Sequence, residues 1–123
     1  MDKSAVKPIY QRILLKISGE ALQGGNESGI DADTLTRVCN DVVGLVRLGV
    51  QVGIVVGAGN FIRGAELCAT GFDRVAADQM GMLATVINGL AFLDVFDRQQ
   101  IPATIMSAIA GVVVVWVMGM GKK

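Results

Sequence analysis

Histidine is absent from the 123-residue sequence, and cysteine and proline occur only twice each. Without histidine, a histidine-based catalytic triad and a His–Cys metal cluster are excluded. The two cysteines, Cys39 and Cys68, do not have CxxC spacing. Two thiols in a domain of this size suit a reducing cytosol, where cysteine acts mostly as a small hydrophobe. We therefore expect a cytoplasmic protein.

The sequence also lacks an excess of charge of either sign. Eleven basic and eleven acidic residues give a formal net charge of zero, so no basic field attracts the protein to nucleic acid. The first ten residues, "MDKSAVKPIY", contain no apolar run of the kind found in signal peptides. These absences predict no nucleic-acid partner and no secretion signal.

Apolar residues make up 52% of the sequence and charged residues only 18%. This composition favours a buried core, and the length suits one domain and not two. The segment from Ile101 to Gly121 has no charge and would be about 31 Å long as a helix, enough to cross a bilayer. Pro102, Thr104 and Ser107 dilute its apolar character, so a membrane segment is the less favoured alternative.

The spacing of apolar residues predicts alternating strands and helices. Two short apolar runs, Arg12–Gly19 and Val50–Val56, are typical of buried strands, and "ATIMSAI" (103–109) is a third. Helices are expected from Ile62 to about Ala69 and from about Arg74 to Arg98. A further helix between the first two strands has one apolar face: Leu35, Val38, Cys39, Val42, Leu45 and Val46.

The ends of these helices also carry signals. Asp31 or Asp33 can cap the start of the first helix, and Gly49 is expected as its left-handed C-terminal cap. The long helix is expected to bury a stripe made of Val75, Met82, Leu83, Val86, Ile87, Leu90 and Leu93. Strands that alternate with helices through short connections predict an α/β fold with a mainly parallel sheet.

A glycine-rich turn follows the second strand in "VGIVVGAGNFIRG" (52–64). In parallel α/β sheets ligands bind at the carboxyl ends of strands. Small residues there let the backbone approach a ligand, and Arg63 adds a guanidinium suited to phosphate oxygens. Lys16, with Ser18 and Gly19, offers a second such corner after the first strand. Together they predict a ligand with several phosphates.

Structural explanations compete with this interpretation. The glycine turn can be an ordinary connection, and Lys16 can simply extend its charge from an apolar strand to the surface. Asp78 can serve only the helix dipole. Neither the GxxxxGK[ST] loop nor the dinucleotide-binding fingerprint is present, because the spacing is GxGxxxxG and Asp78 falls within a helical pattern.

Several blocks together resemble the N-terminal half of bacterial uridylate kinases, in the amino acid kinase family. The blocks are "RILLKISGEALQG", "GIDADTL", "LGVQVGIVVGAGNFIRG" and "DQMGMLATVINGLAFLD". The resemblance covers roughly Ile9 to Ile109. It implies phosphoryl transfer from ATP to UMP with Mg²⁺, in an incomplete three-layer α/β/α sandwich. It also implies a homo-oligomer, a hexamer in the family, under nucleotide control.

The resemblance also implies roles for individual residues. ATP binding falls on Lys16, Ile17, Ser18, Gly19, Gly59 and Arg63, and UMP binding on Gly57, Ala58 and Asp78. Lys16 and Arg63 would be catalytic, compensating charge on the transferring phosphoryl group. No residue is assigned as a metal ligand, so Mg²⁺ would arrive with ATP.

The sequence departs from the family pattern in two places. Ala58 stands where the family has the middle of three glycines, which is tolerable only if its φ is negative. After residue 109, "AGVVVVWVMGMGKK" does not resemble the family. We therefore expect a truncated domain (1–109) with a divergent, aggregation-prone apolar tail (110–123). Weak or absent activity is expected.

Two alternatives remain open from the sequence. The first is a non-catalytic nucleotide-binding or subunit-interaction fragment of the same fold. The second is a kinase of this fold acting on a carboxylate or carbamate. The "DQMGMLATVINGLA" block, the part most like uridylate kinases, argues against the second.

Overall fold

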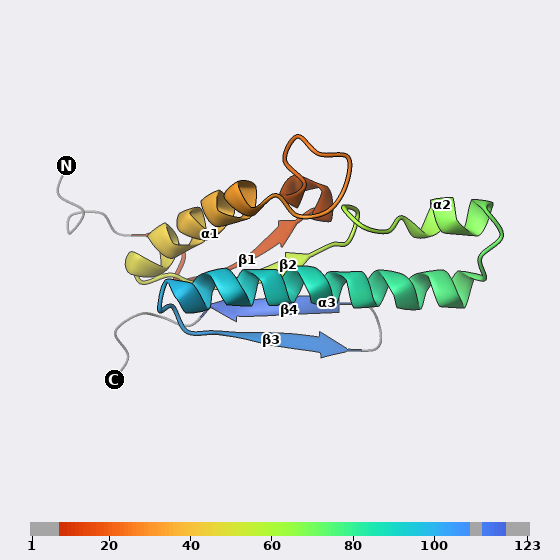
Figure 1. Cartoon of the computed structure of the whole chain (residues 1–123). Coiled ribbons are helices and arrows are strands. Elements are labelled where there is room, and N and C mark those ends of the chain that lie inside the picture. Colours follow the sequence, from red (N-terminus) through yellow and green to blue (C-terminus); the bar gives the residue numbers. More distant parts are fainter. Residues whose placement is uncertain (1–7, 109–111, 118–123) are drawn as a thin grey trace.

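The structure is a computed structural model that describes residues 8–108 and 112–117 (Figure 1). The expected boundary at residue 109 lies outside these residues. The elements follow the predicted order, and the predicted tail adds a strand. They are β1 (Arg12–Ile17), the 3₁₀ helix η2 (Gly19–Leu22), α1 (Ala32–Arg47), β2 (Gln51–Val56), α2 (Gly64–Ala69), α3 (Arg74–Arg98), β3 (Ala103–Ala108) and β4 (Val112–Val117).

The four strands form one mixed sheet in the order β1-β2-β4-β3. β1 and β2 are parallel, whereas β4 is antiparallel to both of its neighbours, so β1, β2 and β3 share one direction. The expected α/β class is confirmed, but the sheet is mixed where a mainly parallel one was expected. The reason is the apolar tail. Only residues 109–111 link β3 to β4, and so short a link permits only an antiparallel pair.

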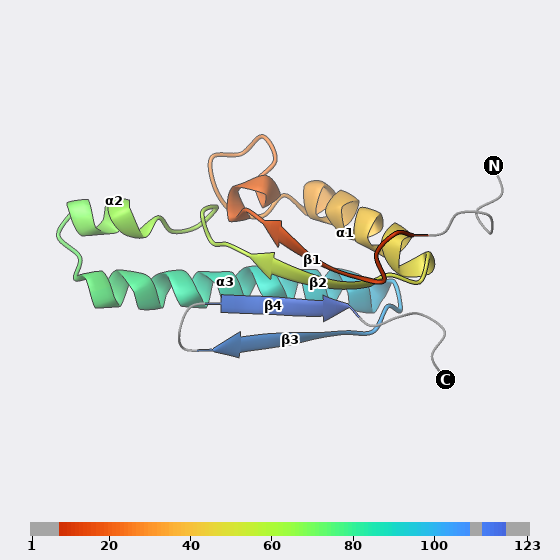
Figure 2. The same cartoon turned by 180° about the vertical axis from the view of Figure 1, so that it is seen from behind.

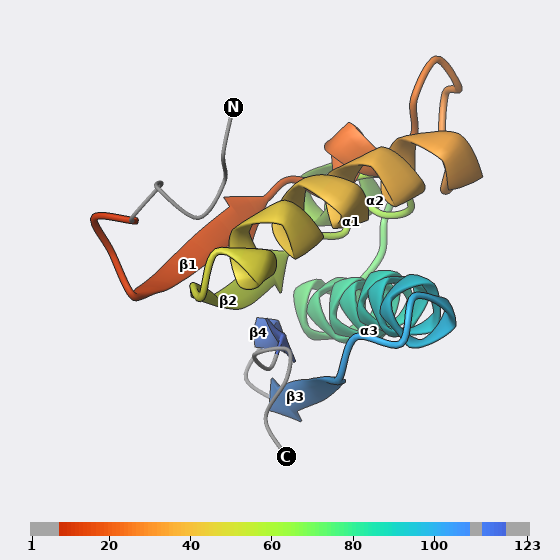
Figure 3. The same ribbon diagram turned by 90° about the vertical axis from the view of Figure 1, so that its left-hand side faces the viewer.

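Both long helices cover the same face of this sheet. α1 contacts α3 and β2, and α3 contacts β3 and β4, which Figure 3 shows in a view roughly along the strands. On β1, Ile13, Leu15 and Ile17 pack toward the core, whereas Leu14 points to the opposite face and is 67% exposed. The described residues therefore supply two of the three layers expected for the complete family fold.

The first helix forms as the sequence predicts. The side chain of Asp31, and not that of Asp33, caps it by accepting bonds from the N–H and the hydroxyl of Thr34, at 3.0 and 2.6 Å. These bonds lower the pKa of Asp31 below its usual value. Gly49 has the expected positive φ of 92°. Cys39 lies in the core, and its burial raises the thiol pKa to about 12, so it acts as a packing residue.

The expected apolar stripe of α3 is largely wrong. Val75, Leu83, Ile87 and Leu90 are exposed, and Leu83 is 65% exposed. The buried face consists instead of Ala77, Ala84, Thr85, Asn88, Gly89, Phe92, Val95 and Phe96. Apolar residues surround most of α3, so their periodicity could not identify the buried face. The buried face is the one that contributes Phe92, Val95 and Phe96 to the core.

α2 and the N-terminal half of α3 extend beyond the end of the sheet, as Figure 2 shows from behind. α3 is long and apolar enough to cross a membrane by length and composition alone. Because α3 packs on β3, β4 and α1, we treat it as a core helix. The described part of the apolar segment 101–121 forms β3 and β4 and not one spanning helix.

Candidate functional site

Two turns meet at the carboxyl ends of β1 and β2. The strands are in register up to the pair Ile17 and Val56, so the segments that follow them emerge side by side. The N–H of Gly57 donates to the carbonyl of Ile17 at 3.0 Å. After β1, the hydroxyl of Ser18 accepts a bond from the N–H of Glu20 at 3.2 Å and starts η2. The predicted corners are therefore adjacent.

Gly19 is the point of closest approach between these turns. A Cβ on this residue would lie 2.5 Å from Asn60 Oδ1, 2.7 Å from the nitrogen of Gly59 and 2.9 Å from the oxygen of Gly57. Contacts this short with backbone atoms cannot be relieved by rotating a side chain. Gly19 is thus required for the two turns to pack together.

Ala58 is compatible with the turn. Among the described residues the one non-glycine residue with positive φ is Gln100, so Ala58 does not have the left-handed conformation that would make its methyl group unfavourable. Gly57, Ala58 and Gly59 are all half-buried. The departure from three glycines is therefore tolerated by the backbone.

A buried pair of asparagines holds the glycine turn against α3. The side-chain amides of Asn60 and Asn88 bond reciprocally, with N–O distances of 3.0 and 2.8 Å. Asn88 Nδ2 also donates to the carbonyl of Gly57 at 2.8 Å, and Asn60 Nδ2 to that of Gly29 at 3.0 Å. Sequence reasoning missed Asn88. The available signal was an amide within the apolar run "TVINGLAF".

Arg63 forms an ion pair that joins the two turns. Its Nη2 lies 2.9 Å from Glu20 Oε2, and the two side chains are 47% and 52% exposed. A pair so exposed contributes at most about 1 kcal/mol to stability. Its structural consequence is that the guanidinium lies beside η2, close to the start of the glycine turn.

Lys16 lies on β1 directly opposite Val55 of β2. It is exposed and alternates with the inward-facing Leu15 and Ile17. Its side chain therefore emerges on the sheet face that α1 and α3 leave open, two residues before Ser18. Lys16 and Ile17 are the last two residues of β1, so the strand places both next to the paired turns. The side chain of Ile17 packs against the core.

Asp78 is not brought to these turns. It lies on the first part of α3, where its Oδ1 is 3.4 Å from Arg74 Nε. It precedes Asn88, which contacts Gly57, by ten residues, or about 15 Å along a helix. Asp78 could therefore reach only the far end of a ligand whose phosphates lie at the glycine turn.

The residues at the turns suit anion binding better than metal binding. No group of three or more Cys, Asp or Glu residues suited to a metal occurs in the part of the chain that the structure describes. Glu20, the acidic side chain placed against the glycine turn, is paired with Arg63.

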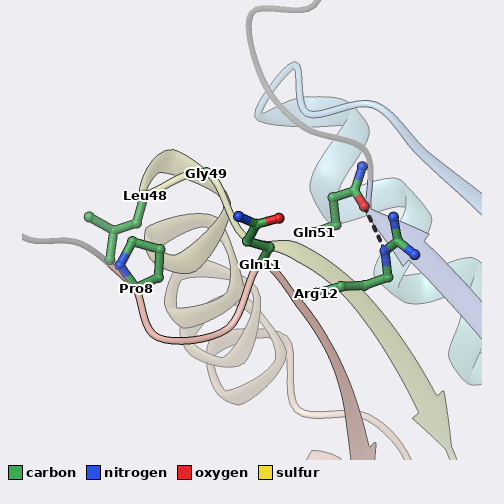
Figure 4. A pocket seen from close by; sticks show the side chains of 6 residues that line it. All are labelled: Pro8, Gln11, Arg12, Leu48, Gly49 and Gln51. Atoms are coloured by element: carbon green, nitrogen blue, oxygen red, sulfur yellow. Dashed lines mark hydrogen bonds between the residues drawn. The ribbon is translucent and has the colours of Figure 1, made fainter.

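A cavity of about 800 Å³ lies away from these two turns. Figure 4 shows that Pro8, Gln11, Arg12, Leu48, Gly49 and Gln51 line it, with Arg12 Nε donating to Gln51 Oε1 at 2.9 Å. Arg12 and Gln51 begin β1 and β2, so this cavity is at the amino ends of the strands. Ligands of α/β sheets collect at the opposite end, and we place the candidate site there.

Comparison with known proteins identifies the family of this chain. The sequence model of the amino acid kinase family matches residues 11–119. The chain belongs to the amino acid kinase family. For this family member the matched range continues past residue 109 into the apolar tail.

Relatives of this chain include uridylate kinases. The uridylate kinase of Pseudomonas aeruginosa strain PAO1 is 58% identical over 107 residues, which are 87% of this chain and 44% of the relative. That of Photobacterium profundum is 60% identical over 103 residues, 84% of this chain and 43% of the relative. The chain thus spans less than half the length of these curated relatives.

Solved structures give the same result. The crystal structure of UMP kinase from Bacillus anthracis matches with a TM-score of 0.68 and 38% identity, covering 73% of this chain and 37% of that one. The crystal structure of UMP kinase from Ureaplasma parvum matches with a TM-score of 0.69 and 36% identity. The match covers 78% of this chain and 42% of that one. The resemblance to uridylate kinase and the amino acid kinase-like fold, in partial form, are both confirmed.

Proposed function

We propose that this chain is the phosphate-binding part of a UMP kinase, which transfers a phosphoryl group from ATP to UMP and produces UDP. The observation that carries the proposal is the contact between the turns that follow β1 and β2, where Gly19 packs against Gly57–Asn60. In this proposal the two strand ends would offer backbone N–H groups and the side chains of Lys16 and Arg63 to one ligand. This is an arrangement suited to a chain of phosphates.

The proposed roles follow from position. Lys16, Ile17, Ser18, Gly19, Gly59 and Arg63 would surround the phosphates of ATP, and Lys16 and Arg63 would offset the charge that develops during transfer. Gly57, Ala58 and Asp78 would contact UMP, with Asp78 at the end away from the phosphates. Mg²⁺, bound to the phosphates of ATP, would neutralise charge on the transferring group.

The proposed setting is the cytoplasm, in an assembly of several copies. The apolar face of α3 supports the assembly. Met80, Leu83, Ala84 and Ile87 line a cavity of about 380 Å³ together with Phe61 and Ile62. A second candidate function is that of a nucleotide-binding or subunit-interaction fragment without catalytic activity.

Calorimetric titration with ATP and with UMP, each alone, tests the proposal. Arg63→Gln and Lys16→Gln should each weaken ATP binding about 10-fold or more, since a hydrogen bond to a charged group contributes about 1.5–3 kcal/mol. Arg98→Gln is the matched control, because Arg98 pairs with Asp94 at the other end of α3. ATP affinity that is equal in all four proteins would refute the assignment of these residues.

A further inference from the structure

Glu20 lies across the glycine turn in this structure. Its Oε2 is 2.9 Å from Arg63 Nη2. Its Cγ and Oε1 lie 3.0 and 3.1 Å from the point that a Cβ on Gly59 would occupy. The carboxylate therefore contacts both the guanidinium and the main chain that the proposed function assigns to the phosphates of ATP.

A carboxylate and a phosphate are alternative partners for these groups. Both present oxygen atoms to a guanidinium fork, and a negative charge held against the turn repels an approaching polyphosphate. We propose that Glu20 is an internal anion that competes with the phosphates of ATP for Arg63 and Gly59, and that it swings aside when they bind. The inference rests on the proposed function of this site.

The local structure allows this movement. The backbone of Glu20 is fixed, because its N–H donates to the hydroxyl of Ser18 and its carbonyl accepts from the N–H of Gln23. Its side chain is 52% exposed, so rotation into solvent requires no change in the core. Breaking so exposed an ion pair lowers an equilibrium constant by at most about fivefold. The competition is therefore strong enough to measure and weak enough for ATP to overcome.

The test is titration of the whole 123-residue chain with inorganic tripolyphosphate and with ATP, both without Mg²⁺. Glu20→Gln keeps the shape of the side chain and removes its charge. We expect it to bind both ligands about 3- to 5-fold more tightly than the unmodified chain. Glu66→Gln is the control, because it removes the same charge from an exposed position in α2. Its affinities should stay within about twofold of the unmodified chain.

A double substitution tests the mechanism. In an Arg63→Gln background no ion pair has to be broken, so the gain from Glu20→Gln should fall to about twofold or less. An undiminished gain would overturn competition for Arg63. If Glu20→Gln binds more weakly than the unmodified chain, Glu20 supports the ligand and the proposal is wrong.

The remaining outcomes separate this inference from the proposed function. Equal tightening by Glu66→Gln would show a general charge effect and overturn the inference alone. A second outcome would also overturn only the inference. In it, the unmodified chain binds ATP, Arg63→Gln weakens that binding, and Glu20→Gln leaves it unchanged. Absence of ATP binding in every protein, with unchanged circular dichroism, would overturn both.

Discussion

Gly19 holds the two turns in contact, and its hydrogen in place of a side chain makes that contact possible. Gly19→Ala would place a methyl carbon 2.7 Å from the nitrogen of Gly59 and 2.9 Å from the oxygen of Gly57. Either turn must then move. We expect the free energy of unfolding to fall by about 1–3 kcal/mol and ATP binding to be lost, measured by urea denaturation and calorimetry.

Gly44→Ala provides the matched control. Gly44 lies inside α1, and a Cβ on it would meet nothing within 4 Å. Alanine is favoured over glycine within a helix by about 0.5–1 kcal/mol, so this substitution should stabilise the protein and leave binding unchanged. Equal stability and equal ATP binding in both variants would contradict the packing described for the turns.

At the scale of single residues, the sequence alone indicated part of the candidate site. Gly57, Gly59 and Arg63 could be identified because glycine after a strand and a nearby guanidinium are local signals. Glu20 and Asn88 could not be identified, because their roles depend on contacts with residues distant in the sequence. Glu20 pairs with Arg63, 43 positions away, and Asn88 bonds to Gly57, 31 positions away. Local spacing contains no information about which distant turn a side chain will meet.

Helix α3 has two apolar faces. One packs on β3, β4 and α1, and the other is exposed. Phe92 and Phe96 are fully buried and their rings stack with centroids 6.3 Å apart, whereas Leu83 and Ile87 are exposed. Phe92→Ala should lower the free energy of unfolding by about 3–5 kcal/mol. The double substitution Leu83→Gln and Ile87→Gln should change it by no more than about 0.5 kcal/mol in dilute protein. Urea denaturation measures both.

Sedimentation of the same variants examines the exposed face. If copies of this chain associate through α3, as proposed, the glutamine variant should sediment as a smaller species than the unmodified chain at equal concentration. A large loss of stability in the glutamine variant, or none in Phe92→Ala, would show that the buried face of α3 has been assigned incorrectly.

β4 shows the limit of prediction for an element. The run "VVVVWV" was predicted to be part of an aggregation-prone apolar tail, and its place as a strand between β2 and β3 was not predicted. Pairing with β2 joins Val52 to Val117 and Val55 to Val114, across about half of the chain. β-propensity describes how a residue suits a sheet. It does not specify the neighbouring strand.

At the scale of the whole molecule, one face of the sheet is not covered by α1 or α3 in the described part of the chain. A Cβ on Gly53 would lie 3.0 Å from Leu14 Cδ1 and 3.2 Å from Trp116 Cε3, so the side chains of Leu14 and Trp116 converge over this glycine. They do so on the face opposite α1 and α3. Leu14 remains 67% exposed. Burying this apolar surface would contribute about 25 cal/mol for each Å² removed from water.

We expect the part of the uridylate kinase chain that these 123 residues do not contain to bind this face. The experiment co-expresses this chain with the C-terminal portion of the Pseudomonas aeruginosa relative that lies beyond the matched region. The two polypeptides should co-purify, and ADP formation that depends on UMP should rise at least about 10-fold above that of the 123-residue chain alone.

Leu14→Asp should abolish both effects, because it places a charge where apolar surface must be buried. Ile9→Asp, an equally apolar-to-acidic change at an exposed position outside the sheet, should leave them intact. Turnover by the 123-residue chain alone at about 1–100 s⁻¹, the range of ordinary kinases, would show that the missing portion is not needed.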